Sequence, residues 1–237
     1  MTTKTDLAPP LRMLPLPRHW WVWTIAGVLL AVALGIFVTS DPQFATVDYT
    51  LNRWFDEHRL PVVDWIAIAI ARIFSPLGAI IILVATLLLT RRRDRTMRTG
   101  SAFVFVVAVA WGGNQILKLI FQRPRPDLSV LTDPIVSIPL SYSYPSGHAS
   151  ISAALAIGLW LLAWRTRWQR AATIGLPFLF VVVALSRIYL GVHYPTDVIG
   201  ALFITTAGAL LAMWIWNTWI ASKFRDEDDS GSTEGLA

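Results

Sequence analysis

Six long apolar stretches limit what this chain can fold into more than any other feature of its sequence. Crossing the hydrocarbon core of a bilayer takes about 20 apolar residues in a helix, which satisfies its own backbone hydrogen bonds without water. The chain is 55% hydrophobic and only 15% charged, whereas soluble domains carry roughly a quarter charged residues. The sequence therefore predicts an all-α integral membrane bundle of six transmembrane helices. The stretches cover residues 20–38, 74–90, 100–121, 148–164, 171–186 and 198–222.

Two apolar segments need a closer interpretation. Residues 20–38 also resemble a cleaved signal peptide, because the small residues 31–33 are typical of a cleavage site. These small residues lie inside the apolar run rather than after it, which favours an uncleaved helix. Residues 62–73 are apolar but contain Asp64 and Arg72. We expect them to form a short interfacial helix that leads into the second span, with no role assigned to Arg72.

The positions of the basic residues predict how the bundle is oriented. Thirteen Lys and Arg residues lie in the termini and in the turns 91–98 and 165–170, whereas six lie on the other side, with Arg72 set aside. Loops rich in Lys and Arg stay in the cytoplasm, so we expect both termini there, in a multi-pass protein of the plasma membrane. This topology accounts for the net charge of +5 without nucleic-acid binding. In chain order we expect a loose cytoplasmic tail over 1–19, a membrane domain over 20–222 and a disordered acidic tail over 223–237.

Three polar segments at the ends of spans carry the candidate chemistry, and the predicted topology places all three on the external face. A single Lys or Arg at a span end is usually a snorkelling side chain. Three such cations, each beside a Pro, Ser or His, instead predict a phosphate site, because convergent cations stabilise the charge of a phosphoryl-transfer transition state. The segments contain Lys118 with Arg125-Pro126, then Pro145-Ser146-Gly147-His148, and then Ser186-Arg187 with His193 and Asp197.

The histidines and the carboxylate predict a nucleophile. Asp197 lies four positions after His193, a spacing that places two side chains on one face of a helix. A carboxylate that accepts from one ring nitrogen leaves the other nitrogen free to attack. A structural His–Asp pair or half of a metal site are the alternatives, but a metal needs more ligands than His148 adds. We therefore expect no metal.

The segment around Ser146 has two interpretations. It directly precedes the fourth span, where free N–H groups of a helix N-terminus bind anions. Gly147 lets the backbone come close to a ligand, and the Ser146 hydroxyl can donate to an oxygen. The alternative is a plain N-cap with an incidental histidine.

Together, the three segments resemble the signature motifs of the type 2 phosphatidic acid phosphatase superfamily, membrane lipid phosphatases related to vanadium haloperoxidases. The resemblance runs from Lys118 to Asp197, and Asn114 also fits it. It implies a six-helix membrane fold and hydrolysis of a phosphomonoester or diphosphate with neither metal nor cofactor. His193 would form a phosphohistidine, Asp197 would orient it and His148 would protonate the leaving group. The phosphoryl group would be held by Lys118, Arg125, Arg187, Ser146 and the Gly147 backbone.

The spacing from Lys118 is satisfied by Arg125, so the neighbouring Arg123-Pro124 pair changes none of these assignments.

The resemblance leaves the substrate open within lipid phosphates and diphosphates. A polyprenyl diphosphate such as undecaprenyl diphosphate is expected first, followed by phosphatidylglycerol phosphate and phosphatidic acid. A lipid phosphotransferase on the same fold would pass the phosphoryl group to another lipid rather than to water. A lipid or ion transporter, the alternative of a different class, would need titratable residues at mid-span, whereas these charges cluster at span ends. Membrane lipids are the expected partners, and nothing in the sequence predicts an oligomeric state.

Overall fold

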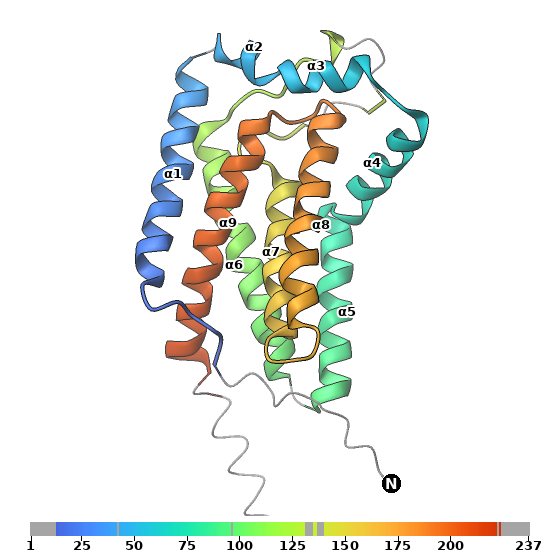
Figure 1. Ribbon diagram of the computed structural model, residues 1–237. Helices are drawn as coiled ribbons and strands as arrows, with labels where there is room; N and C mark the ends of the chain where they lie inside the picture. Colours follow the sequence, from blue (N-terminus) through green and yellow to red (C-terminus); the bar gives the residue numbers. More distant parts are fainter. Residues whose placement is uncertain are drawn as a thin grey trace, which may run out of the picture.

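The computed structural model describes residues 13–41, 43–95, 97–130, 135–136, 140–221 and 223. Within these residues the chain is helical and contains no strand, which confirms the prediction of an all-α fold (Figure 1). The helices are α1 Trp20–Ser40, α2 Phe44–Asp48, α3 Thr50–Glu57, α4 Pro61–Ile73, α5 Pro76–Asp94, α6 Arg98–Phe121, α7 Gly147–Ala163, α8 Gln169–Tyr189 and α9 Pro195–Ile215, with short turns η1 Leu128–Val130 and η2 Trp216–Ile220.

The six predicted spans correspond to α1, α5, α6, α7, α8 and α9, but they are not alike in length. Among the described residues, α1, α6, α8 and α9 with η2 are each long and apolar enough to cross a membrane. Helices α4 and α5 pass the same test only together, as a pair bent by 60°. Helix α7 is apolar but only 17 residues long. The described chain thus contains four candidate spans, or five with the bent pair.

Local sequence explains the bend between α4 and α5. Pro76 begins α5, where its fixed backbone is compatible with the first helical turn. The Ser75 hydroxyl caps the helix by accepting from the Gly78 N–H at 3.1 Å. A Cβ atom on Gly78 would lie 2.0 Å from the Ile73 carbonyl oxygen, so only glycine fits this close approach. Residues 62–73 thus form most of α4, and α4 leads into α5.

The bundle is packed around α6, α7 and α9, which contact one another. Their shared core contains Phe103, Val107, Leu155 and Leu210 among its buried side chains. On the outer faces, large apolar side chains of α1, α5 and α8 are exposed, and so is Leu119 of α6. An apolar surface of this extent fits lipid rather than water, so the chain is a membrane protein.

The two ends of the bundle are formed by different segments. Figure 1 shows the start of α1, the α5–α6 and α7–α8 turns and the end of α9 at one end, while α2 and α3 lie across the other. At the first end, the Leu14 N–H donates to the Asn217 side chain at 2.8 Å, and the Asn217 amide donates back to the Leu14 carbonyl at 3.0 Å. Of the expected tails, residues 1–12 and 224–237 lie outside the described residues.

Candidate active site

The candidate residues converge at the end of the bundle that α2 and α3 cross. They come from the end of α6 and the loop after it, from the start of α7 and from the end of α8. The others come from the loop between α8 and α9 and from the first turn of α9. A cavity of about 460 Å³ joins this polar cluster to an apolar wall. Its polar lining includes Lys118, Arg125, Gly147, His148, Arg187 and His193.

His193 and Asp197 form a buried pair, but not on the face of one helix as the spacing predicted. Helix α9 begins at Pro195, whose ring stops the helix from extending back to His193. His193 instead lies in the preceding loop, and the Asp197 carboxylate reaches back from the first turn. The imidazole Nδ1 lies 3.2 Å from Oδ2 of Asp197. The same oxygen accepts from the Tyr194 N–H at 2.9 Å and from the Ser143 hydroxyl.

Arg125 contacts the opposite side of the His193 ring. Its Nη1 lies 3.0 Å from Nε2 of His193 and 2.6 Å from the Val192 carbonyl oxygen. A guanidinium only donates, so Nε2 carries a lone pair and Nδ1 carries the proton that points to Asp197. Burial, together with the charge of Arg125, lowers the pKa of His193 well below its ordinary value of 6.5. The imidazole is therefore neutral, as a nucleophile has to be.

The two other cations face the same cavity. The Lys118 ammonium donates to the Tyr142 carbonyl at 2.6 Å. Arg187 is only 4% exposed, and its Nε and Nη2 have no hydrogen-bond partner among the described residues. Buried donors without a partner are costly, and these donors belong to a side chain that lines the cavity.

At the start of α7, the structure places the N-cap at Ser146 and the cavity lining at the next two residues. Ser146 is fully buried, and its hydroxyl accepts from the Ala149 N–H at 3.5 Å, as an N-cap does. Its carbonyl accepts from the Asn114 amide at 3.5 Å. Gly147 and His148 line the cavity. The N-cap and the cavity lining therefore belong to adjacent residues.

Arg123, which received no role from the sequence, is part of the buried cluster. It is 3% exposed, and its Nη1 donates to Oδ1 of Asp197 at 2.7 Å. Its Nη2 donates to Oδ2 of Asp48 at 3.0 Å, and its Cζ lies 3.9 Å from the centre of the Tyr194 ring. The Arg-x-Arg spacing was the available signal, because residues two apart in an extended segment lie on the same face, which would direct both arginines to one site. Arg123 holds the Asp197 side of the pair and Arg125 holds the histidine side.

Comparisons with known proteins show the family to which the chain belongs. Residues 99–221 match the model of the PAP2 superfamily, and the chain belongs to this family of phosphatases. An undecaprenyl-diphosphatase of Sulfolobus acidocaldarius is 27% identical over 202 residues, 84% of this chain and 89% of that protein. Decaprenylphosphoryl-5-phosphoribose phosphatase of Mycobacterium tuberculosis is 34% identical over 134 residues, 56% of this chain and 68% of that protein.

A solved structure shares the fold. The transmembrane PAP2-type phosphatidylglycerolphosphate phosphatase of Bacillus subtilis superposes with a TM-score of 0.71 at 21% identity. The superposition covers 81% of this chain and 94% of that one. The family resemblance is thereby confirmed, and the chain is a hydrolase that acts on phosphoester bonds.

Proposed function

We propose that the protein is a membrane lipid phosphatase that hydrolyses a lipid phosphomonoester or diphosphate, with polyprenyl diphosphate such as undecaprenyl diphosphate as the preferred class. The cavity is the observation that carries this proposal. Its cations and imidazoles suit a phosphate, and its apolar wall from α5, α6 and α7 suits a lipid chain next to it. The apolar lining residues are Phe74, Pro76, Ala79, Ile80, Leu83, Trp111, Ile151 and Val192.

The proposed mechanism has two displacements at phosphorus. In the first, Nε2 of His193 attacks, the bond from phosphorus to the leaving oxygen breaks, and His148 gives that oxygen a proton. Asp197 holds the Nδ1 proton and stabilises the imidazolium as it forms. In the second, His148 takes a proton from water, whose oxygen attacks phosphorus while the nitrogen–phosphorus bond breaks. Inorganic phosphate leaves and His193 returns to its neutral form.

The phosphoryl oxygens are proposed to be bound by protein cations and α7 N–H groups, without a metal or another cofactor. The ligands would be Lys118, Arg125, Arg187 and the Gly147 backbone, together with Ser146, whose hydroxyl can donate to a phosphoryl oxygen while it accepts from the Ala149 N–H. Arg125, which now donates to Nε2, would donate to a phosphoryl oxygen once substrate enters. A rapid acid quench of the reaction with 32P-labelled substrate tests this mechanism. We expect an acid-labile phosphoprotein that is absent from His193→Ala, and its absence from the wild type under all conditions would contradict the proposal.

The membrane arrangement is a further part of the proposal. We propose that all six long helices cross the bilayer as one domain over 20–222, between tails over 1–19 and 223–237. Helix α7, at 17 residues, is roughly 25 Å long, and the polar loops at both of its ends complete the crossing. Both termini would be cytoplasmic and the active site external. The support is the thirteen-to-six distribution of basic residues together with the placement of both basic turns at the end opposite the site (Figure 1).

A phosphate-release assay over a panel of lipids tests the substrate class. The Sulfolobus relative is named for undecaprenyl diphosphate and the Bacillus structure for phosphatidylglycerol phosphate, so both lipids belong in the panel with phosphatidic acid. We expect the highest kcat/KM with undecaprenyl diphosphate. A higher value with either glycerolipid would change the substrate class. Consumption of the substrate only in the presence of an acceptor lipid, without release of inorganic phosphate, would indicate a phosphotransferase.

A further inference from the structure

The segment formed by α2 and α3, residues 44–57, lies outside the region that matches the family yet contacts the catalytic loop. It runs across the end of the bundle above the start of α9 (Figure 1). Val47 and Trp54 are 65% and 52% exposed, whereas Asp48 and Asn52 are 6% and 1% exposed. An exposed surface helix normally buries apolar side chains and exposes polar ones. Asp48 and Asn52 depart from this pattern, so these two buried polar side chains have a specific task.

Asn52 holds the main chain of the candidate nucleophile. Its side-chain amide donates to the carbonyl of His193 at 3.0 Å and to the carbonyl of Ile188 at 2.8 Å. These carbonyls belong to the last turn of α8 and to the loop before α9. One buried amide therefore fixes the distance between the end of α8 and the His193 backbone.

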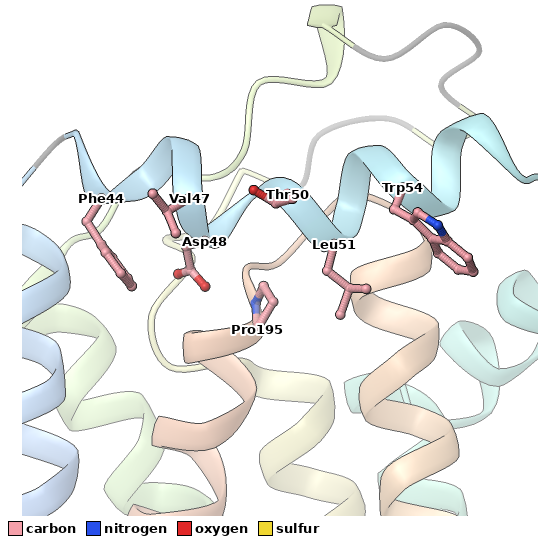
Figure 2. Close-up of a pocket in the computed structure, with 7 residues that line it drawn as sticks. All are labelled: Phe44, Val47, Asp48, Thr50, Leu51, Trp54 and Pro195. Atoms are coloured by element: carbon pink, nitrogen blue, oxygen red, sulfur yellow. The ribbon is translucent and has the colours of Figure 1, made fainter.

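Asp48 holds the carboxylate that orients His193. Its Oδ1 accepts from the Thr196 N–H at 3.3 Å, and its Oδ2 accepts from the Thr196 hydroxyl and from Arg123 Nη2 at 3.0 Å. Arg123 in turn donates to Asp197, which pairs with His193. Figure 2 shows the Asp48 carboxylate projecting from α2 towards Pro195 at the start of α9. A continuous row of buried, oppositely charged groups thus runs from the segment to the imidazole.

We propose that Asp48 and Asn52 are positioning residues for His193, and that these two side chains tie the 44–57 segment to the catalytic loop. This inference rests on the proposed role of His193 as nucleophile. Neither residue lines the cavity that holds the cations, so neither contacts the phosphate. Removing either one should misalign Nε2 without weakening phosphate binding, and misplacement by about 1 Å costs on the order of a hundredfold in rate.

Steady-state kinetics of Asp48→Asn and Asn52→Ala in the full-length protein test the proposal. We expect kcat to fall by about ten- to a hundredfold in each, while KM and the inhibition constant of inorganic phosphate stay within about twofold of wild type, as for a transition-state effect. Asp48→Glu restores the carboxylate and should recover part of the loss. Thr50→Ala, an exposed position on the same segment, is the matched control and should keep wild-type kcat.

The possible results separate three cases. A kcat in both variants no lower than in Thr50→Ala would overturn the positioning role. If kcat fell only in proportion to the fraction of folded protein, measured by thermal unfolding in detergent, the residues would be merely structural. That result would overturn the positioning role as well. His193→Ala, assayed in the same series, reports on the proposed function alone. If it retained turnover, the nucleophile would be wrong and the positioning proposal would fall with it.

Discussion

Nη1 of Arg125 and Nε2 of His193 lie 3.0 Å apart at the polar end of the cavity. Since the guanidinium donates, the contact leaves the lone pair on the ring nitrogen that faces the substrate space and the proton on the nitrogen that faces Asp197. In the proposed mechanism, this guanidinium also binds a phosphoryl oxygen. Substrate would therefore replace the histidine as the acceptor for Arg125 at the moment when the ring nitrogen is needed for attack.

Substitution of His193 by alanine should abolish phosphate release. A covalent nucleophile has no substitute in the cavity, and we expect a loss of several orders of magnitude in kcat. The measurement is phosphate release by purified protein, with thermal unfolding in detergent to show that the variant is folded. Retention of as much as a third of wild-type turnover would remove His193 from the mechanism.

The His193 ring should stay neutral, as the Nδ1–H tautomer, at pH values where an ordinary histidine is half charged. Its pKa lies well below 6.5 because burial and the charge of Arg125 disfavour the imidazolium. Lowering the pH from 7.5 to 6 should therefore leave its 15N shifts unchanged. NMR of histidine-labelled protein provides the measurement, and the signals missing from His193→Ala identify the ring. A titration midpoint near 6.5 would contradict the geometry.

Activity should survive an excess of EDTA. Lys118, Arg125 and Arg187 already supply positive charge to the cavity, so a divalent ion has no required task there. The assay is phosphate release before and after chelation, with Mg²⁺, Mn²⁺ and Zn²⁺ added back one at a time. Loss on chelation with rescue by one ion would restore the metal interpretation of the histidines and Asp197.

The site should be reachable from outside the cell. The chain has no native cysteine, so a single cysteine reports its own location. Leu140→Cys, at an exposed position in the loop before α7, should react with an impermeant maleimide in intact cells. Trp168→Cys, exposed in the basic α7–α8 turn, should react only after lysis. The reverse pattern would invert the topology and make phosphatidylglycerol phosphate the first candidate substrate.

Gly200→Ala should destabilise the protein by roughly 1–3 kcal/mol, the usual cost of overpacking. A Cβ atom there would lie 2.3 Å from the Tyr144 hydroxyl oxygen, and this buried hydroxyl is fixed by its hydrogen bond to the Ala31 carbonyl. We expect a lower melting temperature in detergent. Gly175→Ala is the control, because no atom lies within 4 Å of its added Cβ apart from its chain neighbours and its own helix backbone. An unchanged melting temperature for Gly200→Ala would show that Tyr144 can move.

Long apolar runs and short-range spacing carried most of what the sequence could predict. The six long helices follow the apolar runs because hydrophobic length is a property of one segment alone. The cations and histidines at the ends of α6, α7 and α8 could be assigned to one site because their spacing matched a family. Helix α7 is shorter than a typical span, and its run of apolar residues could not show that its neighbours bury it on several sides.

Contacts between distant segments could not be predicted in the same way. Asp48 and Asn52 look like the solvent-facing side of a small helix, and their partners lie 75 to 148 positions further along the chain. Arg123 looked like one more charge of an outer loop until the fold placed it between two carboxylates. The prediction that His193 and Asp197 share one face of a helix was wrong, because α9 begins at Pro195, between the two residues.

The row of charges from Asp48 through Arg123 also sets the size of the unit that can be exchanged between relatives. A graft of residues 99–221 carries the histidines and cations but leaves behind the carboxylate and the amide that hold them from α2 and α3. It also leaves behind the α1 carbonyl that accepts from Tyr144. We expect chimeras joined at residue 99 to fold around an ill-aligned imidazole, and chimeras that retain this chain's residues 20–57 with the graft to be the functional ones.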